Sequence, residues 1–213
     1  VKVSLTVEKA NREPERQEWL FAAGLSDYLL QTLAADPVIP LFEGAHFADG
    51  KESEDVAEGE GASWCIAFTE DGNAVRESYV NLIPTVAGGT HESGLKDGLF
   101  VAVKGFIDMH GLLPKGVKLM PDDVFSRASF VLSAKVLDPQ FQGQIKERLN
   151  SREALRLVSN CVRPAFELWP HPHVEPGRKH AAPITRQHTT PPRRTPTSRT
   201  RPRPGPPRPH RAG

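Results

Sequence analysis

The chain has 213 residues, a length that favours a single domain with or without an appendage. Its formal charge of +1 is divided unevenly, because residues 1–169 carry 17 basic and 25 acidic side chains whereas residues 170–213 carry ten and one. All 15 aromatic residues (Phe, Trp and Tyr) and both cysteines precede residue 170, whereas 12 of the 20 prolines follow Trp169. The first part can therefore bury a core, and the tail cannot.

The same composition argues against several classes of protein. No apolar run approaches the ~18 residues that a membrane span needs. The chain opens on alternating polar and apolar residues, so we expect no secretory signal peptide. Cys65 and Cys161 lie far apart and indicate neither a disulfide framework nor a zinc site. We therefore expect a cytoplasmic protein without membrane association.

The N-terminal third predicts a hairpin, a short helix and a loop. Apolar and polar residues alternate over residues 1–8, which predicts a half-buried strand, and Gln17–Phe21 is a candidate return strand. Ser26 and Asp27 can cap a helix over Tyr28–Ala34. Residues 43–61 hold seven carboxylates without the EF-hand spacing, so we interpret this segment as a solvated loop rather than a metal site.

The next segments predict two strands and a long helix. Ala62–Thr69 and Arg76–Thr85 are apolar and β-branched, and Glu70–Asn73 between them is typical of a hairpin turn. A helix is predicted from Thr90 to about His110, with a buried stripe of Leu95, Leu99, Val103 and Phe106.

Before the tail, the sequence predicts two more helices with a strand between them. Pro121 followed by two aspartates indicates the first start. Arg127–Leu137 predicts a strand. Asn150 is the expected N-cap of the last helix, and Pro164 is expected to kink or shorten that helix. The element order predicts an α+β fold in which helices cover one face of a mixed sheet, followed by a disordered tail.

Two polar segments are candidates for chemistry. Gly88-Gly89-Thr90-His91 lacks the spacing of a phosphate-binding P-loop, so we interpret it as a tight strand-to-helix turn; the alternative is an anion-binding turn with His91 as a general base. Gln140–Arg148 contains Gly143, Gln144 and Lys146. An ammonium beside an amide donor can stabilise a transferred phosphoryl group, but on composition alone this segment is a solvated loop.

Several motifs together resemble one family, the B subunits of the bacterial type IIA topoisomerases, topoisomerase IV (ParE) and gyrase. The motifs that carry the resemblance are Ser78–His91 (SYVNLIPTVAGGTH), Gly94-Leu95, Gly98-Leu99, Leu113–Leu119 (LPKGVKL), Phe130–Lys135 (FVLSAK) and Asp138–Glu153 (DPQFQGQIKERLNSRE). The resemblance implies that residues 9–168 form the transducer domain, which has the ribosomal-protein-S5 domain-2-like fold. Residues 1–8 are then the candidate last strand of a preceding GHKL-type ATPase domain.

The resemblance also assigns site residues. In the family, a loop of this domain contacts the γ-phosphate of ATP bound to the ATPase domain. The matching positions here are Gln144, which would bind ATP, and Lys146, which would bind it and stabilise the phosphoryl charge. Ile145 replaces the threonine that the family has between them.

The implied whole protein is an ATP-hydrolysing DNA topoisomerase that passes one DNA duplex through another. Its implied partners are DNA, the A subunit of topoisomerase IV and a second copy bound through the ATPase domain. The groups that hold Mg²⁺ and activate water, and the TOPRIM carboxylates, would lie outside this chain. We therefore expect no metal ligands here and no ATP hydrolysis by the isolated chain.

Residues 169–213 have no counterpart in the resemblance. A frame change in a GC-rich gene produces this mixture of proline, arginine, histidine and threonine, and we favour it because the resemblance stops inside a helix. The alternative is a basic tail that makes the chain a nucleic-acid-binding module, and a third possibility is an inert product of a damaged gene. His171 and His173 lack further metal ligands, so we interpret them as solvated.

Overall fold

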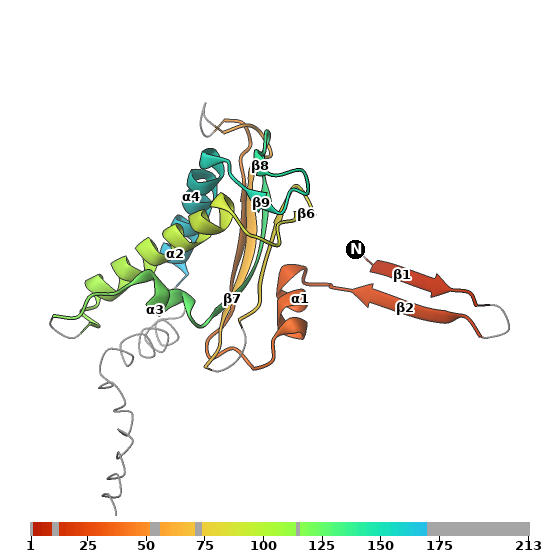
Figure 1. The fold of residues 1–213 in the computed structure, drawn as a ribbon. Coiled ribbons are helices and arrows are strands. Elements are labelled where there is room, and N and C mark those ends of the chain that lie inside the picture. Colours follow the sequence, from red (N-terminus) through yellow and green to blue (C-terminus); the bar gives the residue numbers. More distant parts are fainter. Residues whose placement is uncertain (1, 10–12, 52–55, 71–73, 114–115, 170–213) are drawn as a thin grey trace, which may run out of the picture.

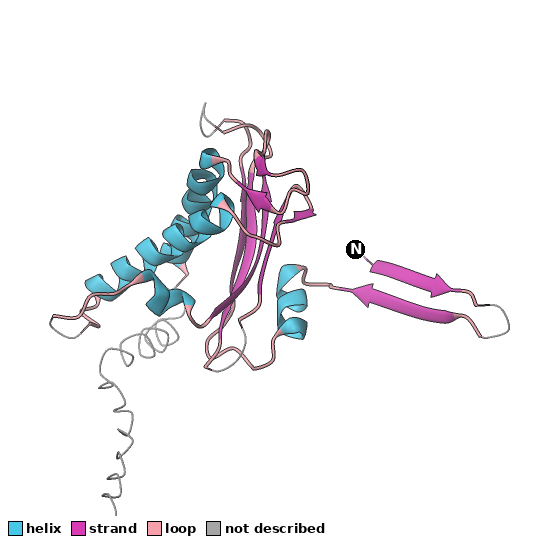
Figure 2. Ribbon diagram, viewed as in Figure 1, coloured by secondary structure: helices cyan, strands magenta, loops and turns pink. Residues whose placement is uncertain are grey.

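The computed structural model describes residues 2–9, 13–51, 56–70, 74–113 and 116–169. The predicted disordered tail and most of the predicted turn at 70–73 lie outside these residues. The elements, in chain order, are β1 (Lys2–Val7), β2 (Glu15–Leu20), α1 (Leu25–Thr32), β3 (Phe42–Phe47), β4 (Gly61–Phe68), β5 (Arg76–Val80), β6 (Ile83–Pro84), α2 (Thr90–Met109), α3 (Pro121–Phe125), β7 (Ala128–Lys135), β8 (Phe141–Gln142), β9 (Arg148–Leu149) and α4 (Arg152–Leu168). Figures 1 and 2 show their arrangement.

A mixed sheet in the order β3-β4-β7-β5-β6 forms the centre of the molecule. β4 is antiparallel to both β3 and β7, and β5 runs parallel to β7. The chain passes from β5 to β7 through α2, as a parallel pair requires a long crossover. The predicted hairpin between residues 62–69 and 76–85 is wrong, because β7 lies between β4 and β5.

Helices cover both faces of this sheet, so the prediction of helices on one face is wrong for α1. Alternate side chains of β4 and β7, among them Trp64, Ile66, Phe130 and Leu132, enter a core with α2, α3 and α4. The intervening side chains Cys65, Ala67 and Val131 pack with Leu29 of α1. α1 lies on the face of the sheet opposite to α2, α3 and α4 (Figure 1). Burial on both faces explains why these strands are almost continuously apolar.

The acidic segment also differs from the prediction, because its first residues form β3. This edge strand pairs in register with β4 from Phe42↔Ile66 to Phe47↔Gly61. Phe42 anchors it in the core at 1% exposure, whereas the other residues of the strand are only partly covered or exposed. A solvated edge explains why glutamate and histidine occur in a strand.

The long helices form where the sequence predicts them, but α4 is capped differently. Its N-cap is Ser151 rather than Asn150, and no side chain caps the first turn. The Ser151 hydroxyl instead accepts a hydrogen bond from the backbone N–H of Gln140 at 2.7 Å. Pro164 does not end the helix, which continues to Leu168.

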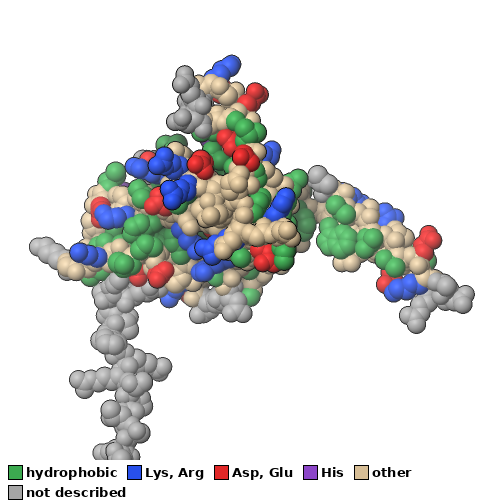
Figure 3. All heavy atoms as spheres, turned by 45° about the horizontal axis from the view of Figure 1, so that its top comes forward, with side chains coloured by type: hydrophobic (Ala, Val, Ile, Leu, Met, Phe, Trp, Pro, Cys, Tyr) green, Lys and Arg blue, Asp and Glu red, His purple; other side chains and the backbone are tan. Residues whose placement is uncertain are grey.

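The β1–β2 hairpin projects away from the sheet and helices (Figure 1). Both strands form as predicted, yet β1 is exposed along its whole length rather than half-buried. Val3 lies directly opposite Trp19, and these side chains remain 53% and 36% exposed. With Leu5 and Val7 they form an apolar hairpin face, part of which is visible in Figure 3.

Candidate functional site

The loop that contains Gln144 and Lys146 connects the two strands of a small hairpin. Phe141 of β8 pairs with Leu149 of β9, and Gln142 pairs with Arg148, which leaves residues 143–147 as the loop. Leu149 is completely buried and anchors the hairpin in the main core. The backbone N–H of Asn150 also donates to the Gln140 carbonyl at 2.7 Å, so hydrogen bonds hold the two ends of the hairpin together at the base of the loop.

The loop itself is exposed and has an unusual backbone. Gln144, Ile145 and Lys146 are exposed to solvent, Ile145 to 80%. Lys146 has a φ of 58°, which is the left-handed region that non-glycine residues seldom adopt. The pairing of β8 with β9 fixes both ends of the five-residue loop in which Lys146 adopts this conformation.

The Lys146 ammonium is available to a negatively charged ligand. Its Nζ lies 5.7 Å from the centre of the Phe141 ring, a cation–π contact that contributes only ~0.5–1 kcal/mol at an exposed site. Within the part of the chain that the structure describes, no carboxylate forms an ion pair with it. The Lys146 ammonium and the NH₂ group of the Gln144 amide can both donate hydrogen bonds, which suits phosphoryl oxygens.

The glycine-rich turn that the sequence singled out contacts the base of this loop. The Ala87 N–H donates to the Glu147 carbonyl at 3.0 Å, and the Leu149 N–H donates to the Gly88 carbonyl at 3.1 Å. Gly89 forms a parallel bridge with Leu149. The fold therefore places residues 87–89 against residues 147–149, although the two segments are far apart in the sequence.

His91 lies behind this turn with no exposed surface, which does not suit the alternative of a surface general base. Its Nε2 is 3.0 Å from the Thr85 hydroxyl, and within the described residues its Nδ1 has no hydrogen-bond partner. Burial lowers the pKa of His91 from 6.5 to about 4, so the imidazole is neutral at pH 7.

A second polar cluster fixes α1 to the sheet rather than forming a reactive site. The hydroxyls of Tyr28 and Tyr79 both donate to Oε2 of Glu77, at 2.8 and 2.9 Å. The pKa of Tyr28 is raised mainly by the hydrogen bond to Glu77. The pKa of Tyr79 is raised mainly by burial. Both phenols therefore stay protonated at neutral pH and serve as donors.

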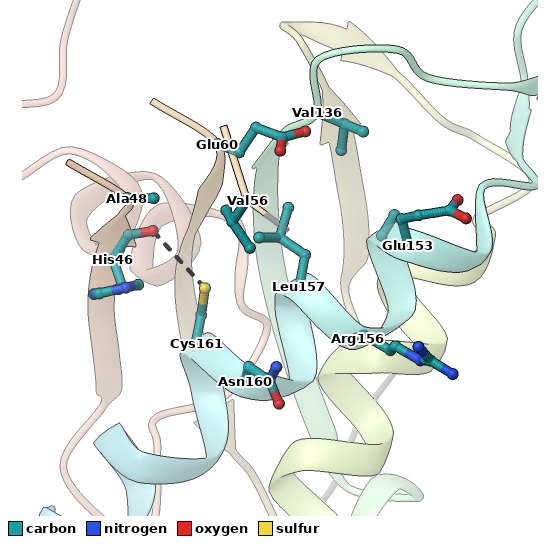
Figure 4. Close-up of a pocket in the computed structure, with 11 residues that line it drawn as sticks. His46, Ala48, Val56, Glu60, Val136, Glu153, Arg156, Leu157, Asn160 and Cys161 are labelled. Carbon is teal, nitrogen blue, oxygen red and sulfur yellow. Dashed lines mark hydrogen bonds between the residues drawn. The ribbon is translucent and has the colours of Figure 1, made fainter. Parts of the chain in front are cut away.

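The structure also contains a cavity of about 710 Å³ between α4 and the end of the sheet. Figure 4 shows His46, Glu60 and Cys161 among the residues around it; the Cys161 thiol donates to the His46 carbonyl at 3.9 Å. No motif predicts this cavity, because its lining residues come from segments far apart in the sequence. Among the described residues, no group of three His, Cys, Asp or Glu side chains could hold a metal ion.

The chain belongs to the DNA gyrase B family, whose model matches residues 24–188. It is 48% identical over 164 residues to the B subunit of DNA topoisomerase 4 from Pseudomonas aeruginosa, and 43% identical over 162 residues to the corresponding protein from Escherichia coli K12. These matches cover 76% and 75% of the chain. The chain spans about a quarter of each relative, 25% and 24%.

Solved structures agree with this family. The topoisomerase IV ATP binding domain of Francisella tularensis, in complex with a small-molecule inhibitor, is similar with a TM-score of 0.65 at 28% identity. The match covers 83% of the chain and 46% of that domain. The 43K ATPase domain of Thermus thermophilus gyrase B has the same fold, with a TM-score of 0.69 at 21% identity and coverage of 86% and 48%. The resemblance stated from the motifs is confirmed, as is a mixed sheet in an α+β arrangement.

The family model extends past Trp169 into the proline- and arginine-rich segment. The origin of residues 170–213 stays a prediction, as do the domain boundaries at residues 8 and 168. A membrane-spanning helix is not found among the described residues, where none is both long and apolar enough.

Proposed function

We propose that this chain is the transducer segment of a type IIA topoisomerase B subunit, which passes the nucleotide state of an adjoining ATPase domain to the rest of the enzyme. The observation that carries this proposal is the exposed loop 143–147, which carries Gln144 and Lys146 and is closed by the paired strands β8 and β9. Family membership supports it, as does the span of the matches, since the chain covers about half of each solved ATPase-region structure, 46% and 48%.

In this proposal the loop binds the γ-phosphate of ATP held by the adjoining domain. The Gln144 amide orients the terminal phosphoryl group, and the Lys146 ammonium stabilises the charge that develops on it. Neither group breaks a bond alone. The isolated chain therefore hydrolyses no ATP; Mg²⁺ and the attacking water belong to the adjoining domain.

The β1–β2 hairpin supports the presence of that neighbour. Its apolar face of Val3, Leu5, Val7 and Trp19 is exposed, and contiguous exposed apolar side chains are typical of a surface that another domain covers. In the whole protein this face would be covered by the ATPase domain. The same whole protein would dimerise through that domain and act on DNA together with the A subunit.

ATP turnover in a full-length B subunit that carries this sequence tests the proposal. Lys146→Ala should lower turnover about 10²- to 10³-fold, the usual effect of removing a preorganised group from a developing charge. Lys118→Ala is the matched control, because Lys118 is a lysine outside the loop. Ile145→Thr should keep or raise turnover. Equal turnover by Lys146→Ala and the parent would refute the phosphate-contact role.

A further inference from the structure

The turn at residues 85–89 holds the backbone on the C-terminal side of Lys146. Glu147 directly follows Lys146, and its carbonyl accepts the Ala87 N–H at 3.0 Å. Two residues further on, the Leu149 N–H donates to Gly88 at 3.1 Å. These bonds attach the hairpin to the turn at both ends of the segment 147–149, so a displacement of the turn displaces Lys146.

The contact leaves no room for a side chain at position 89. A Cβ on Gly89 would lie 2.6 Å from the Leu149 nitrogen and 2.9 Å from its Cα, distances that real Cβ atoms do not show. Gly89 also has a φ of 147°, which L-residues with a side chain rarely adopt. A larger residue at position 89 must therefore separate the turn from β9.

The turn is held in place by a chain of buried hydroxyl groups. The Ser78 hydroxyl donates to the Glu92 carboxylate at 2.6 Å. The Ser78 hydroxyl has only this one proton to donate. The Thr85 hydroxyl is therefore the donor to Ser78, whose hydroxyl oxygen is 2.7 Å away and whose carbonyl oxygen is 2.9 Å away. The imidazole must consequently donate from Nε2 to Thr85. In this arrangement Nδ1 of His91 carries no proton, and among the described residues it has no hydrogen-bond partner.

We infer that Thr85, Gly89 and His91 are positioning residues that set the place of the Lys146 ammonium through the backbone of residues 147–149. The inference rests on the proposed function of Lys146 and goes beyond it, since it assigns a role to a buried network that contacts no ligand. It also explains why a buried histidine and two buried hydroxyls occur at this sheet edge, where apolar side chains would fill the space without needing partners.

The first test measures amide hydrogen exchange in the 213-residue chain. Gly89→Ala should speed exchange of the Leu149 and Ala87 amides at least tenfold while the amides of α2 keep their protection. Gly105→Ala is the matched control, because a Cβ there meets no atom within 4 Å beyond the adjoining backbone of α2. Unchanged exchange at Leu149 and Ala87 in Gly89→Ala would overturn the inference, whatever happens to ATP turnover.

The second test is a double-mutant cycle on ATP turnover in the full-length protein. Gly89→Ala should lower turnover about 10- to 100-fold in the parent, since a displacement near 1 Å has effects of this size. In the Lys146→Ala background the same change should alter turnover less than twofold, because Gly89 acts through Lys146. An equal loss in both backgrounds would show a merely structural role and overturn the inference.

Thr85→Val and Thr85→Ser provide the same test if Gly89→Ala prevents folding. Valine keeps the shape but removes the hydroxyl, so turnover should fall, whereas serine restores the hydroxyl and should restore turnover. Failure of serine to rescue would count against the hydroxyl chain. If Lys146→Ala alone leaves turnover unchanged, the proposed function fails, and the exchange measurement still decides whether the turn positions the loop.

Discussion

Gly94 of α2 lies directly against the backbone of Leu155 in α4. A Cβ at position 94 would stand 3.0 Å from the Leu155 Cα and closer still to its carbonyl oxygen. One turn later, a Cβ on Gly98 would stand 2.8 Å from the Ser159 carbonyl oxygen. The two glycines let the α4 backbone approach α2 closely, and this packing holds the two helices together.

Gly94→Ala should therefore destabilise the chain, whereas Gly105→Ala should not. The added methyl group at position 94 forces two helices apart, and overpacking of this kind costs about 1–3 kcal/mol in free energy of unfolding. Position 105 is open, so alanine there should gain up to about 1 kcal/mol from its helix propensity. Urea denaturation measures both changes. A stability gain at both positions would contradict the close packing of α2 and α4.

Because His91 is buried, we predict that the free energy of unfolding decreases as the pH falls from about 6.5 to about 4. Burial lowers its pKa in the folded chain to about 4, against an ordinary value of 6.5, so the unfolded chain binds the proton more tightly between these values. The full difference corresponds to about 3 kcal/mol. Urea unfolding at several pH values should show this slope in the parent and lose it in His91→Gln. His110→Gln, at an exposed site, should keep the slope; an unchanged slope in His91→Gln would contradict the assignment.

The sequence predicts the long helices well, because each has a strong apolar stripe. Leu95, Leu99 and Val103 of α2 are buried as expected. Strand partners were harder to predict, because periodicity says which residues form a strand but not which strand lies beside it. The turn residues between β4 and β5 favoured a hairpin, yet β7, which follows both in the chain, inserts between them.

The candidate site could be predicted only in part. The motif resemblance proposes Gln144 and Lys146 as site residues, which stays a prediction, whereas composition alone indicated a solvated loop. The attachment of this loop to Gly88 and Gly89 is a tertiary contact that no local pattern contains. The edge strand β3 was missed for another reason, since its glutamate and glycine residues are typical of loops and its apolar anchor is the single residue Phe42.

If the basic tail is a functional segment, we expect it to bind DNA independently of the rest of the chain. Residues 170–213 carry ten basic side chains and one acidic side chain. Each phosphate contact would add about one unit to the salt dependence of log K, so binding should weaken steeply with salt. Removing the residues after Trp169 should abolish this binding without changing the unfolding midpoint. Undiminished DNA binding by residues 1–169 would contradict a role for the tail, and the nucleotide sequence around codons 165–175 would reveal a frame change.

The most direct test of the γ-phosphate contact compares two nucleotides in the full-length protein. Lys146→Ala should weaken binding of a non-hydrolysable ATP analogue about 10- to 100-fold, which corresponds to one charge-assisted hydrogen bond. Binding of ADP should change less than twofold, because ADP has no γ-phosphate for Lys146 to contact. Equal Kd changes for both nucleotides, or no change for the analogue, would contradict the proposal that this loop senses the γ-phosphate.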